Sequence, residues 1–411
     1  MSNYVHNDES LPSRRIMLFD LDSDGHHSIY IQHLVEYWLR NRPMGRLFVV
    51  VSPSFVQTFP NIANVPKMSR ARFIAVGNDE YDFVRKSQSK IARRYNEWGL
   101  INRYARQLNA DRCLIMYFDH LQLPFILGRR PPCPVSGIYF RPSFHYNNFP
   151  GNATTYASKL RQLMYWHMLV RVLTRPYLKN LFCLDPFGTR YIKKLIPEAK
   201  ILPLPDPVQI YDSEHSSKER LKASLGVAST RRIFLLFGAI TKRKGVYQVL
   251  KSLTLLPRSV GERLCLMIVG SVEPSETASL LSQIDQIRKT SPVEIILRNG
   301  FVSDRCAEPY FQISDVVITL YQNHVGSSNV LLRAAATGRP VLASHFGLIG
   351  EMVRTYNLGI TVDASAPQEI AKAVIALVEH DPTETFDYAA AKQLAAENST
   401  NLFTHTLFRN L

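Results

Sequence analysis

Three consecutive cations in the second half of the chain could bind a phosphate group. Gly238 closes the apolar run 233–237, and Lys242, Arg243 and Lys244 follow just before a segment of helical periodicity. A glycine at a strand end lets the backbone turn, and backbone N–H groups and cationic side chains at a helix start can hold a diphosphate. The plainer interpretation is a solvated basic loop, because short basic runs are common.

A second pattern of this kind lies in the segment 326–344. Ser327, Ser328 and Asn329 open a helical stretch that stops at Gly338 and leads into a strand. Hydroxyl and amide side chains are ordinary helix N-caps. The same helix start also has free N–H groups that can face an anion, so capping and anion binding are both open interpretations.

Polar side chains also end two strand-like segments of the first half. Asp119 and His120 end one apolar run, and Arg141 and His145 come just after the next one. Ligands of parallel sheets bind at the carboxyl ends of the strands, which makes these residues candidates for chemistry. An ion pair between Asp119 and Arg141 that serves only the fold is an equally good interpretation.

The loop after the first strand carries further candidates. It begins at Asp20 and contains Gly25, His26 and His27, just before an amphipathic helix. Its alternating aspartates resemble a calcium loop, but the rest of the twelve-residue ligand pattern is absent. We therefore interpret Gly25, His26 and His27 as residues of a ligand site or as ordinary solvated residues.

The elements that must position these residues alternate between short apolar runs and longer segments of helical periodicity. Continuous apolar strands interleaved with helices predict parallel sheets covered on both faces. We therefore predict an α/β fold with two Rossmann-like, doubly wound domains that face each other across a cleft. The apolar runs lie at 15–21, 47–51, 72–76, 113–119, 135–140, 181–185 and 201–204, and at 233–238, 264–270, 293–297, 315–320, 340–344 and 359–362.

The segment 202–207 separates the two series. It holds three prolines in five residues, which cannot continue a helix or a central strand. We predict an N-terminal domain at 1–205, a second domain at 206–382, and a helical tail at 383–411 that could pack back on the first domain.

Composition limits the class of protein. The 411 residues are 46% hydrophobic, so two domains with large cores are expected. The net charge of +15 is uneven, with 28 basic and 14 acidic residues in 1–205 against 21 and 20 in 206–411. Five separated cysteines, no signal-peptide pattern and no long apolar run predict a reduced, cytoplasmic protein without a membrane span.

At this point the second half resembles a known family over residues 230–380. The motifs, in order, are Gly238 to Gly245, the string Gly-Phe-Val-Ser-Asp at 300–304, the string Ala-Ala-Thr-Gly-Arg-Pro-Val-Leu-Ala-Ser at 335–344, and Gly347 followed by Glu351. They are similar to the donor-binding half of retaining nucleotide-sugar glycosyltransferases of the GT-B fold, the glycosyltransferase family 4 and glycogen-synthase-like enzymes. The first half matches this family in layout only.

The resemblance implies a donor-binding set. Lys244 matches the family lysine that holds the donor diphosphate, whereas Ala239 stands where the family has an arginine, so Lys242 or Arg243 would supply the second charge. Two family glutamates are replaced by Val325 and Arg333. A guanidinium cannot accept hydrogen bonds from a ribose, and one interpretation of Arg333 is a phosphate contact. The implied donor-binding residues are Gly238, Lys242, Arg243, Lys244, Phe301, Val302, Ser327, Ser328, Arg333 and Glu351.

The resemblance also implies roles in the first half. Asp119 and His120 are the predicted catalytic residues, because a carboxylate beside the sugar can stabilise positive charge in the transition state. Gly25, His26, His27, Arg141 and His145 are the predicted acceptor-binding residues, suited to an anionic acceptor. The diphosphate charge would be met by cations and helix N-termini, with no cofactor and no obligatory metal.

The segment 159–179 is basic, aromatic and apolar. Such a stretch can lie on an anionic bilayer, and the plainer alternative is a core helix with charged ends. A net charge of +14 in 1–205 could also serve nucleic-acid binding, but no recognised reader motif is present, and we expect no nucleic-acid partner.

The sequence thus predicts a cytoplasmic, hexosyltransferase-like enzyme of carbohydrate biosynthesis. It would move a sugar from a nucleotide-sugar donor to a glycan, lipid or small-molecule acceptor, with retention. A GT-B-shaped binder of sugar nucleotides or glycans without catalysis is one alternative, motivated by Val325 and Arg333, and a nucleic-acid-binding protein is the second.

Overall fold

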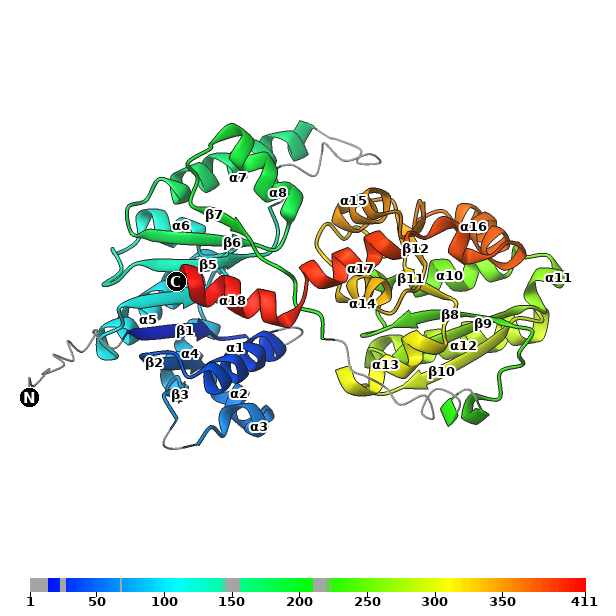
Figure 1. The fold of residues 1–411 in the computed structure, drawn as a ribbon, viewed down its shortest axis with the longest axis horizontal. Coiled ribbons are helices and arrows are strands. Elements are labelled where there is room, and N and C mark those ends of the chain that lie inside the picture. The colour runs from blue at the N-terminus through cyan, green and yellow to red at the C-terminus, as the bar shows by residue number, and fades with distance from the viewer. Residues whose placement is uncertain are drawn as a thin grey trace, which may run out of the picture. The chain divides into compact units, whose positions relative to one another are not determined.

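The computed structural model describes residues 14–22, 27–66, 69–142, 144, 156–209, 220–221 and 223–411, and their backbone forms two compact units (Figure 1). Unit 1 extends to Phe144 and continues with Lys159–Leu204 and Phe403–Leu411, and unit 2 contains Pro205–Leu402.

Unit 1 is built on a parallel sheet with the strand order β3-β2-β1-β4-β5-β6-β7. In register, Ile16 of the central strand lies opposite Leu47 on one side and Arg112 on the other. The strand order reverses between the first and fourth strands, which is where ligands of such sheets bind. The strands are β1 (Arg15–Asp20), β2 (Arg46–Val51), β3 (Ala71–Ala75), β4 (Arg112–Ile115), β5 (Val135–Tyr139), β6 (Leu178–Cys183) and β7 (Ile201–Pro203).

Helices cover both faces of this sheet, because alternate residues of each strand point to opposite sides. Met17 and Phe19 pack in a core with Trp98, whereas Ile16 and Leu18 pack in a second core on the other face. The helices of unit 1 are α1 (His27–Asn41), α2 (Pro53–Thr58), α3 (Pro60–Ala63), α4 (Asn78–Arg85), α5 (Lys90–Gln107), α6 (Gln122–Leu127), α7 (Tyr156–Leu173) and α8 (Pro186–Leu195).

The C-terminal helix α18 (Thr400–Asn410) completes one of these cores. Phe403 is fully buried, and its ring lies 5.0 Å from that of Tyr30 on α1. Phe408 contacts Trp38 at 5.3 Å between ring centroids. The last turn of the chain is therefore part of the hydrophobic core of unit 1.

Unit 2 repeats the architecture with a parallel sheet in the order β10-β9-β8-β11-β12-β13. Its order reverses between β8 and β11, which are hydrogen-bonded neighbours. The strands are β8 (Arg232–Phe237), β9 (Leu264–Gly270), β10 (Glu294–Asn299), β11 (Val316–Thr319), β12 (Val341–Ser344) and β13 (Gly359–Val362). The helices are the 3-10 turn η2 (Lys242–Lys244), α10 (Val246–Leu253), α11 (Arg258–Gly261), α12 (Pro274–Thr290), α13 (Asp304–Ile313), α14 (Asn329–Ala336), α15 (Gly347–Tyr356), α16 (Pro367–Glu379), the 3-10 turn η3 (Pro382–Thr385) and α17 (Tyr388–Glu397).

The prediction of two doubly wound α/β units is confirmed. The first of the clustered prolines, Pro203, ends the edge strand β7, a position where a residue without an N–H group is tolerated. Four cysteines are buried free thiols and Cys306 is an exposed one. Within the residues that the structure describes, no helix is both long and apolar enough to cross a membrane.

Candidate functional site

The cationic loop of unit 2 starts at the carboxyl end of β8, at the point where the strand order reverses. Gly238 has a φ of 105°, and the loop then forms the turn η2. Gly245 follows with a φ of 74°, and a Cβ atom there would overlap the carbonyl oxygen of Leu320. Only glycine lets this loop lie directly against the end of β11.

Lys244 is the buried member of the cationic run. Its side-chain ammonium donates to the carbonyl oxygen of Phe237 at 3.0 Å and to the hydroxyl of Tyr321 at 2.6 Å, and it lies 4.4 Å from the centre of the Tyr321 ring. The ion pairs found among the described residues of unit 2 do not include Lys244. A buried cation without a carboxylate is costly, and a bound anion would remove that cost.

Tyr321 and His324 are site residues that the sequence analysis missed. The Tyr321 hydroxyl accepts a hydrogen bond from Ser328 at 3.0 Å, and Ser328 caps α14 by accepting the N–H group of Leu331 at 3.4 Å. His324 Nε2 donates to the carbonyl oxygen of Ser327 at 3.0 Å, and its ring lies 5.2 Å from that of Tyr321. Their position directly after the β11 segment was the available signal.

The structure separates the two candidates for a second cationic charge. Lys242 pairs with Glu276 at 3.0 Å, and the hydroxyl of Tyr247 donates to the same carboxylate at 2.5 Å. These contacts, first from Tyr247 and then from Lys242, lower the pKa of Glu276. Arg243 is exposed, and its guanidinium lies 5.3 Å from the centre of the Tyr321 ring. Arg243 therefore shares an aromatic platform with Lys244, whereas Lys242 is held by α12.

Arg333 contacts α13 and not the Lys244–Tyr321 group. Its guanidinium is buried, donates to the carbonyl oxygen of Asp304 at 2.8 Å, and pairs with the Asp304 carboxylate at 3.0 Å and with Glu308 at 3.8 Å. Its ring contact is Phe311, at 5.8 Å. These contacts engage Arg333 with α13, so the arrangement gives a structural reason for this arginine and does not support the predicted phosphate contact.

The remaining predicted donor residues are dispersed around the loops of unit 2. Phe301 is 88% exposed and Val302 is half-buried, both just before α13. Glu351 pairs with Arg354 at 2.9 Å within α15. Gly347, which begins α15, has a φ of 70°. No contact joins Glu351 or Phe301 to Lys244 in the described hydrogen bonds and ion pairs.

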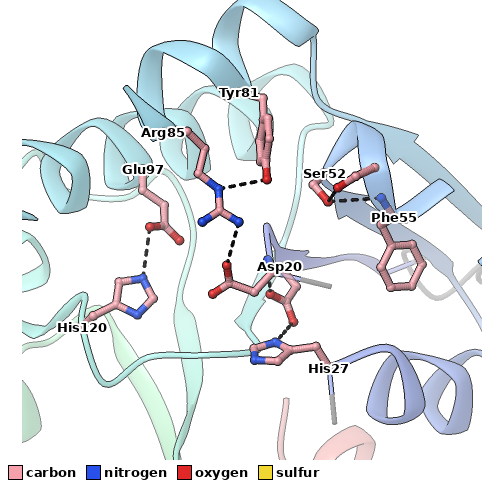
Figure 2. A network of polar contacts seen from close by, with 10 residues as sticks. Asp20, His27, Ser52, Phe55, Tyr81, Arg85, Glu97 and His120 are labelled. Carbon is pink, nitrogen blue, oxygen red and sulfur yellow. Dashed lines mark hydrogen bonds and ion pairs between the residues drawn. The ribbon is translucent and has the colours of Figure 1, made fainter. Parts of the chain in front are cut away.

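A polar network lies at the carboxyl edge of the unit 1 sheet (Figure 2). His27, at the start of α1, has its Nδ1 atom 2.6 Å from the Asp20 carboxylate at the end of β1. Burial raises the pKa of Asp20, and the contact with His27 opposes that rise. Gly25, His26 and His145, which we also predicted in the acceptor site, lie outside the described residues.

A second imidazole–carboxylate pair belongs to the same network. His120 Nε2 lies 3.0 Å from the Glu97 carboxylate, which comes from the middle of α5 (Figure 2). The ring of Tyr117 lies 5.2 Å from His120 and 5.7 Å from His27, so it contacts both imidazoles. Glu97 was not predicted, because nothing in a mid-helix glutamate indicates a partner 23 residues away.

Asp119 braces the end of β5. Its carboxylate accepts the backbone N–H groups of Phe140 at 2.9 Å and Arg141 at 2.8 Å. Burial raises its pKa to about 6, and the two N–H groups act in the opposite direction. The Arg141 side chain is exposed. Asp119 thus contacts Arg141 as one interpretation of the sequence expected, but through the Arg141 backbone N–H group and not through an ion pair. The catalytic role of Asp119 stays a prediction.

The donor atoms for a metal ion do not gather anywhere in the described chain: no group of three or more His, Cys, Asp or Glu side chains is placed to hold one. The charged groups that do gather are the cations beside β8 and the imidazole–carboxylate pairs beside β1 and β4. The first arrangement suits an anion, and the second suits hydroxyl groups, since carboxylates and imidazoles accept their hydrogens.

Comparison with known proteins agrees with the fold of two doubly wound α/β units. Residues 217–393 match the family described as glycosyl transferases group 1, which covers most of unit 2. Solved structures match both units. A glycosyltransferase from Rickettsia africae has a TM-score of 0.66 at 13% identity, and the match covers 97% of this chain and 98% of that one. The chain therefore has the GT-B fold, and residues 217–393 of its second unit are similar to the group 1 glycosyltransferases.

Particular relatives can be named. An uncharacterised glycosyltransferase of Methanocaldococcus jannaschii is 24% identical over 193 residues, 47% of this chain and 46% of the relative. The lipopolysaccharide 1,2-N-acetylglucosaminetransferase of Salmonella typhimurium is 25% identical over 170 residues, 41% and 44% of the two chains. The matches thus span less than half of each of these curated relatives. Anabaena HepE, solved with UDP and glucose, has a TM-score of 0.65 at 14% identity over 96% of this chain and 98% of its own.

Proposed function

We propose that this protein transfers a sugar from a nucleotide-sugar donor to an acceptor hydroxyl, with unit 2 binding the donor diphosphate. The observation that carries the proposal is Lys244, a buried ammonium beside β8 that no carboxylate of the described chain neutralises. Its position at the reversal of strand order supports a ligand role. The structures of HepE with UDP and with UDP-glucose support the same class of donor.

The mechanism we propose is electrostatic. Lys244 and Arg243 would meet the charge that grows on the diphosphate as the glycosidic bond breaks, and the start of α14 would add backbone N–H groups. These groups supply the positive charge themselves, so we propose transfer without an obligatory metal or cofactor. Addition of a chelator should leave the rate unchanged; loss of activity that Mg²⁺ or Mn²⁺ restores would contradict this part.

Retention of configuration and membership of glycosyltransferase family 4 follow, in this proposal, from the motifs around Lys244. The acceptor would bind to unit 1, where the two imidazole–carboxylate pairs face the sheet edge. Proton NMR of the newly formed glycoside would show the anomeric configuration. Inversion relative to the donor would overturn the proposed stereochemistry but not the transfer.

Peripheral membrane contact through 159–179 is part of the proposal. On α7, Leu160, Leu163 and Met164 are 62%, 53% and 51% exposed, beside exposed Lys159 and Arg161. Apolar and cationic side chains together favour an anionic bilayer. Vesicles of phosphatidylglycerol should sediment the protein and phosphatidylcholine vesicles should not; equal behaviour would refute the membrane contact.

The buried free thiols support a reducing, cytoplasmic location.

The donor proposal is tested by calorimetry with uridine, guanosine and adenosine diphosphates. At least one should bind, and Lys244→Ala should weaken it roughly 10- to 100-fold, the value of one hydrogen bond to a charged group. Lys251→Ala removes an exposed lysine from the last turn of α10 and is the matched control. Unchanged affinity in Lys244→Ala would refute the diphosphate assignment.

Catalysis is tested separately, with a panel of nucleotide sugars and acceptors. Tight binding without turnover for every donor and acceptor would support a binding protein instead of an enzyme. Duplex binding with a steep salt dependence that maps to unit 1 would support the nucleic-acid alternative.

A further inference from the structure

The Glu97–His120 pair determines which nitrogen of the His120 imidazole is used by the protein and which is left for a ligand. Glu97 lies in the middle of α5 and is 7% exposed, whereas the His120 side chain is 22% exposed, at the carboxyl edge of the sheet. A carboxylate can only accept hydrogen bonds. The 3.0 Å contact therefore requires that Nε2 of His120 carries the hydrogen.

The consequence concerns the other nitrogen. When the imidazole is neutral, only one nitrogen is protonated, and Nδ1 of His120 is then a hydrogen-bond acceptor. No described protein group bonds to Nδ1, and the Tyr117 ring, packed at 5.2 Å, restricts rotation of the imidazole. Position and tautomer of His120 are thus both set by protein contacts.

Neighbouring charges support this arrangement of the pair. Arg85 donates to the Tyr81 hydroxyl at 2.9 Å and pairs with Asp22 at 3.2 Å, and its charge also acts on Glu97 (Figure 2). Arg85 therefore places a positive charge near the Glu97 carboxylate.

We propose that Glu97 is a positioning residue that holds His120 in the Nε2–H tautomer, so that Nδ1 accepts the hydrogen of a hydroxyl group on a saccharide bound to unit 1. The inference rests on the proposed function for its ligand class, a neutral polyol and not an anion. It assigns to His120 a contact with one sugar hydroxyl, and to Glu97 no contact with the ligand at all.

The direct test is a long-range ¹H–¹⁵N spectrum of the full chain labelled in histidine, with His120 assigned through its loss in His120→Gln. The wild type should show Nε2 protonated and Nδ1 bare. In Glu97→Gln both tautomers should appear, because an amide can either accept from Nε2–H or donate to a bare Nε2. A wild-type His120 with its proton on Nδ1 would overturn the inference.

Kinetics provide a second readout. Glu97→Gln should lower kcat roughly 10- to 100-fold, by analogy with the loss of partners that orient metal-bound imidazoles, with KM for the nucleotide sugar unchanged. Glu80→Gln is the matched control, since Glu80 lies in the same unit and contacts Arg103 and Tyr104 instead of a histidine. It should keep the wild-type tautomer and kcat. A wild-type kcat in Glu97→Gln would contradict the positioning role.

Failure of the proposed function is recognised independently. If the wild type transfers no sugar and binds no nucleoside diphosphate, the enzyme assignment fails while the tautomer is still tested by the spectrum. Titration with glucose should then shift the Nδ1 resonance of His120 in the wild type more than in Glu97→Gln. The absence of that difference would refute the saccharide contact.

Discussion

The pH dependence of unit 1 stability provides a sharp test of the Asp119 environment. Its carboxylate accepts two backbone N–H groups at the end of β5, yet burial raises its pKa to about 6 from an ordinary value of 3.8. The folded protein therefore holds this proton more tightly than the unfolded chain does. The resulting stabilisation is present below about pH 4 and is lost as the pH rises through about 6.

The magnitude follows from the size of the shift. About two pKa units correspond to about 3 kcal/mol of differential stability. The Asp119 side chain is not fully shielded from solvent, so screening reduces this value, and we expect roughly 1–2 kcal/mol. Asp119→Asn cannot ionise. The stability of the wild type relative to Asp119→Asn should therefore fall by this amount between pH 4 and pH 7.5.

Urea unfolding followed by tryptophan fluorescence measures this difference. All three tryptophans, Trp38, Trp98 and Trp166, belong to unit 1, so the signal reports its unfolding. The raised pKa of Asp20 contributes equally to both proteins and cancels in the difference. An exposed aspartate of the same unit is the control: Asp79→Asn should follow the wild type.

A constant difference between wild type and Asp119→Asn across this range would refute the reasoning. If the stability of the wild type relative to Asp119→Asn rises with pH, the two backbone N–H groups outweigh burial and lower the pKa of Asp119. The same variant tests the predicted catalytic role: a kcat unchanged at a pH where the variant is folded would leave Asp119 as a brace for β5 only.

Three further predictions concern the cations, the aromatic platform and the C-terminal helix. Arg243→Ala should weaken nucleoside diphosphate binding about tenfold in calorimetry, whereas Lys242→Ala should change it less than about threefold because Glu276 already holds that ammonium; equal effects would contradict the distinction. Tyr321→Phe removes an acceptor from two donors and should lower the free energy of unfolding of unit 2 by about 2 kcal/mol in calorimetric scans; wild-type stability would show that other groups replace the hydroxyl. Phe403→Ala should cost unit 1 about 3–5 kcal/mol in urea unfolding, and a loss below about 1 kcal/mol would mean that α18 is dispensable for this core.

The alternation of apolar runs with helical segments was enough to predict the architecture. Strands buried on both faces need continuous apolar sequence, and this pattern is local, so it can be read without knowing the strand order. The positions of Lys244 and Ser328 were predicted on the same basis, because a strand followed by a glycine, cations or a capping residue and then a helix is also a local pattern.

Interactions between segments far apart in sequence could not be read in this way. The predicted roles of Lys242 and Arg243 were equivalent until the structure brought Glu276 of α12 to one and Tyr321 to the other. The partners of Arg333 on α13, Asp304 and Glu308, were equally unpredictable, while its phosphate contact stays a prediction. Each outcome depends on which helix packs beside which strand end.

The sequence by itself determined the periodicity of the elements, the doubly wound class and the place of the cationic loop, because hydrophobic period and turn chemistry are properties of neighbouring residues. Only the tertiary structure decided which side chains are neutralised and which remain available. The order of the sheets sets β11 against β8, so that Tyr321 contacts Lys244, and it sets α5 against the end of β4, so that Glu97 contacts His120. Burial and partner choice are collective results of packing, and they control the electrostatics of both sites.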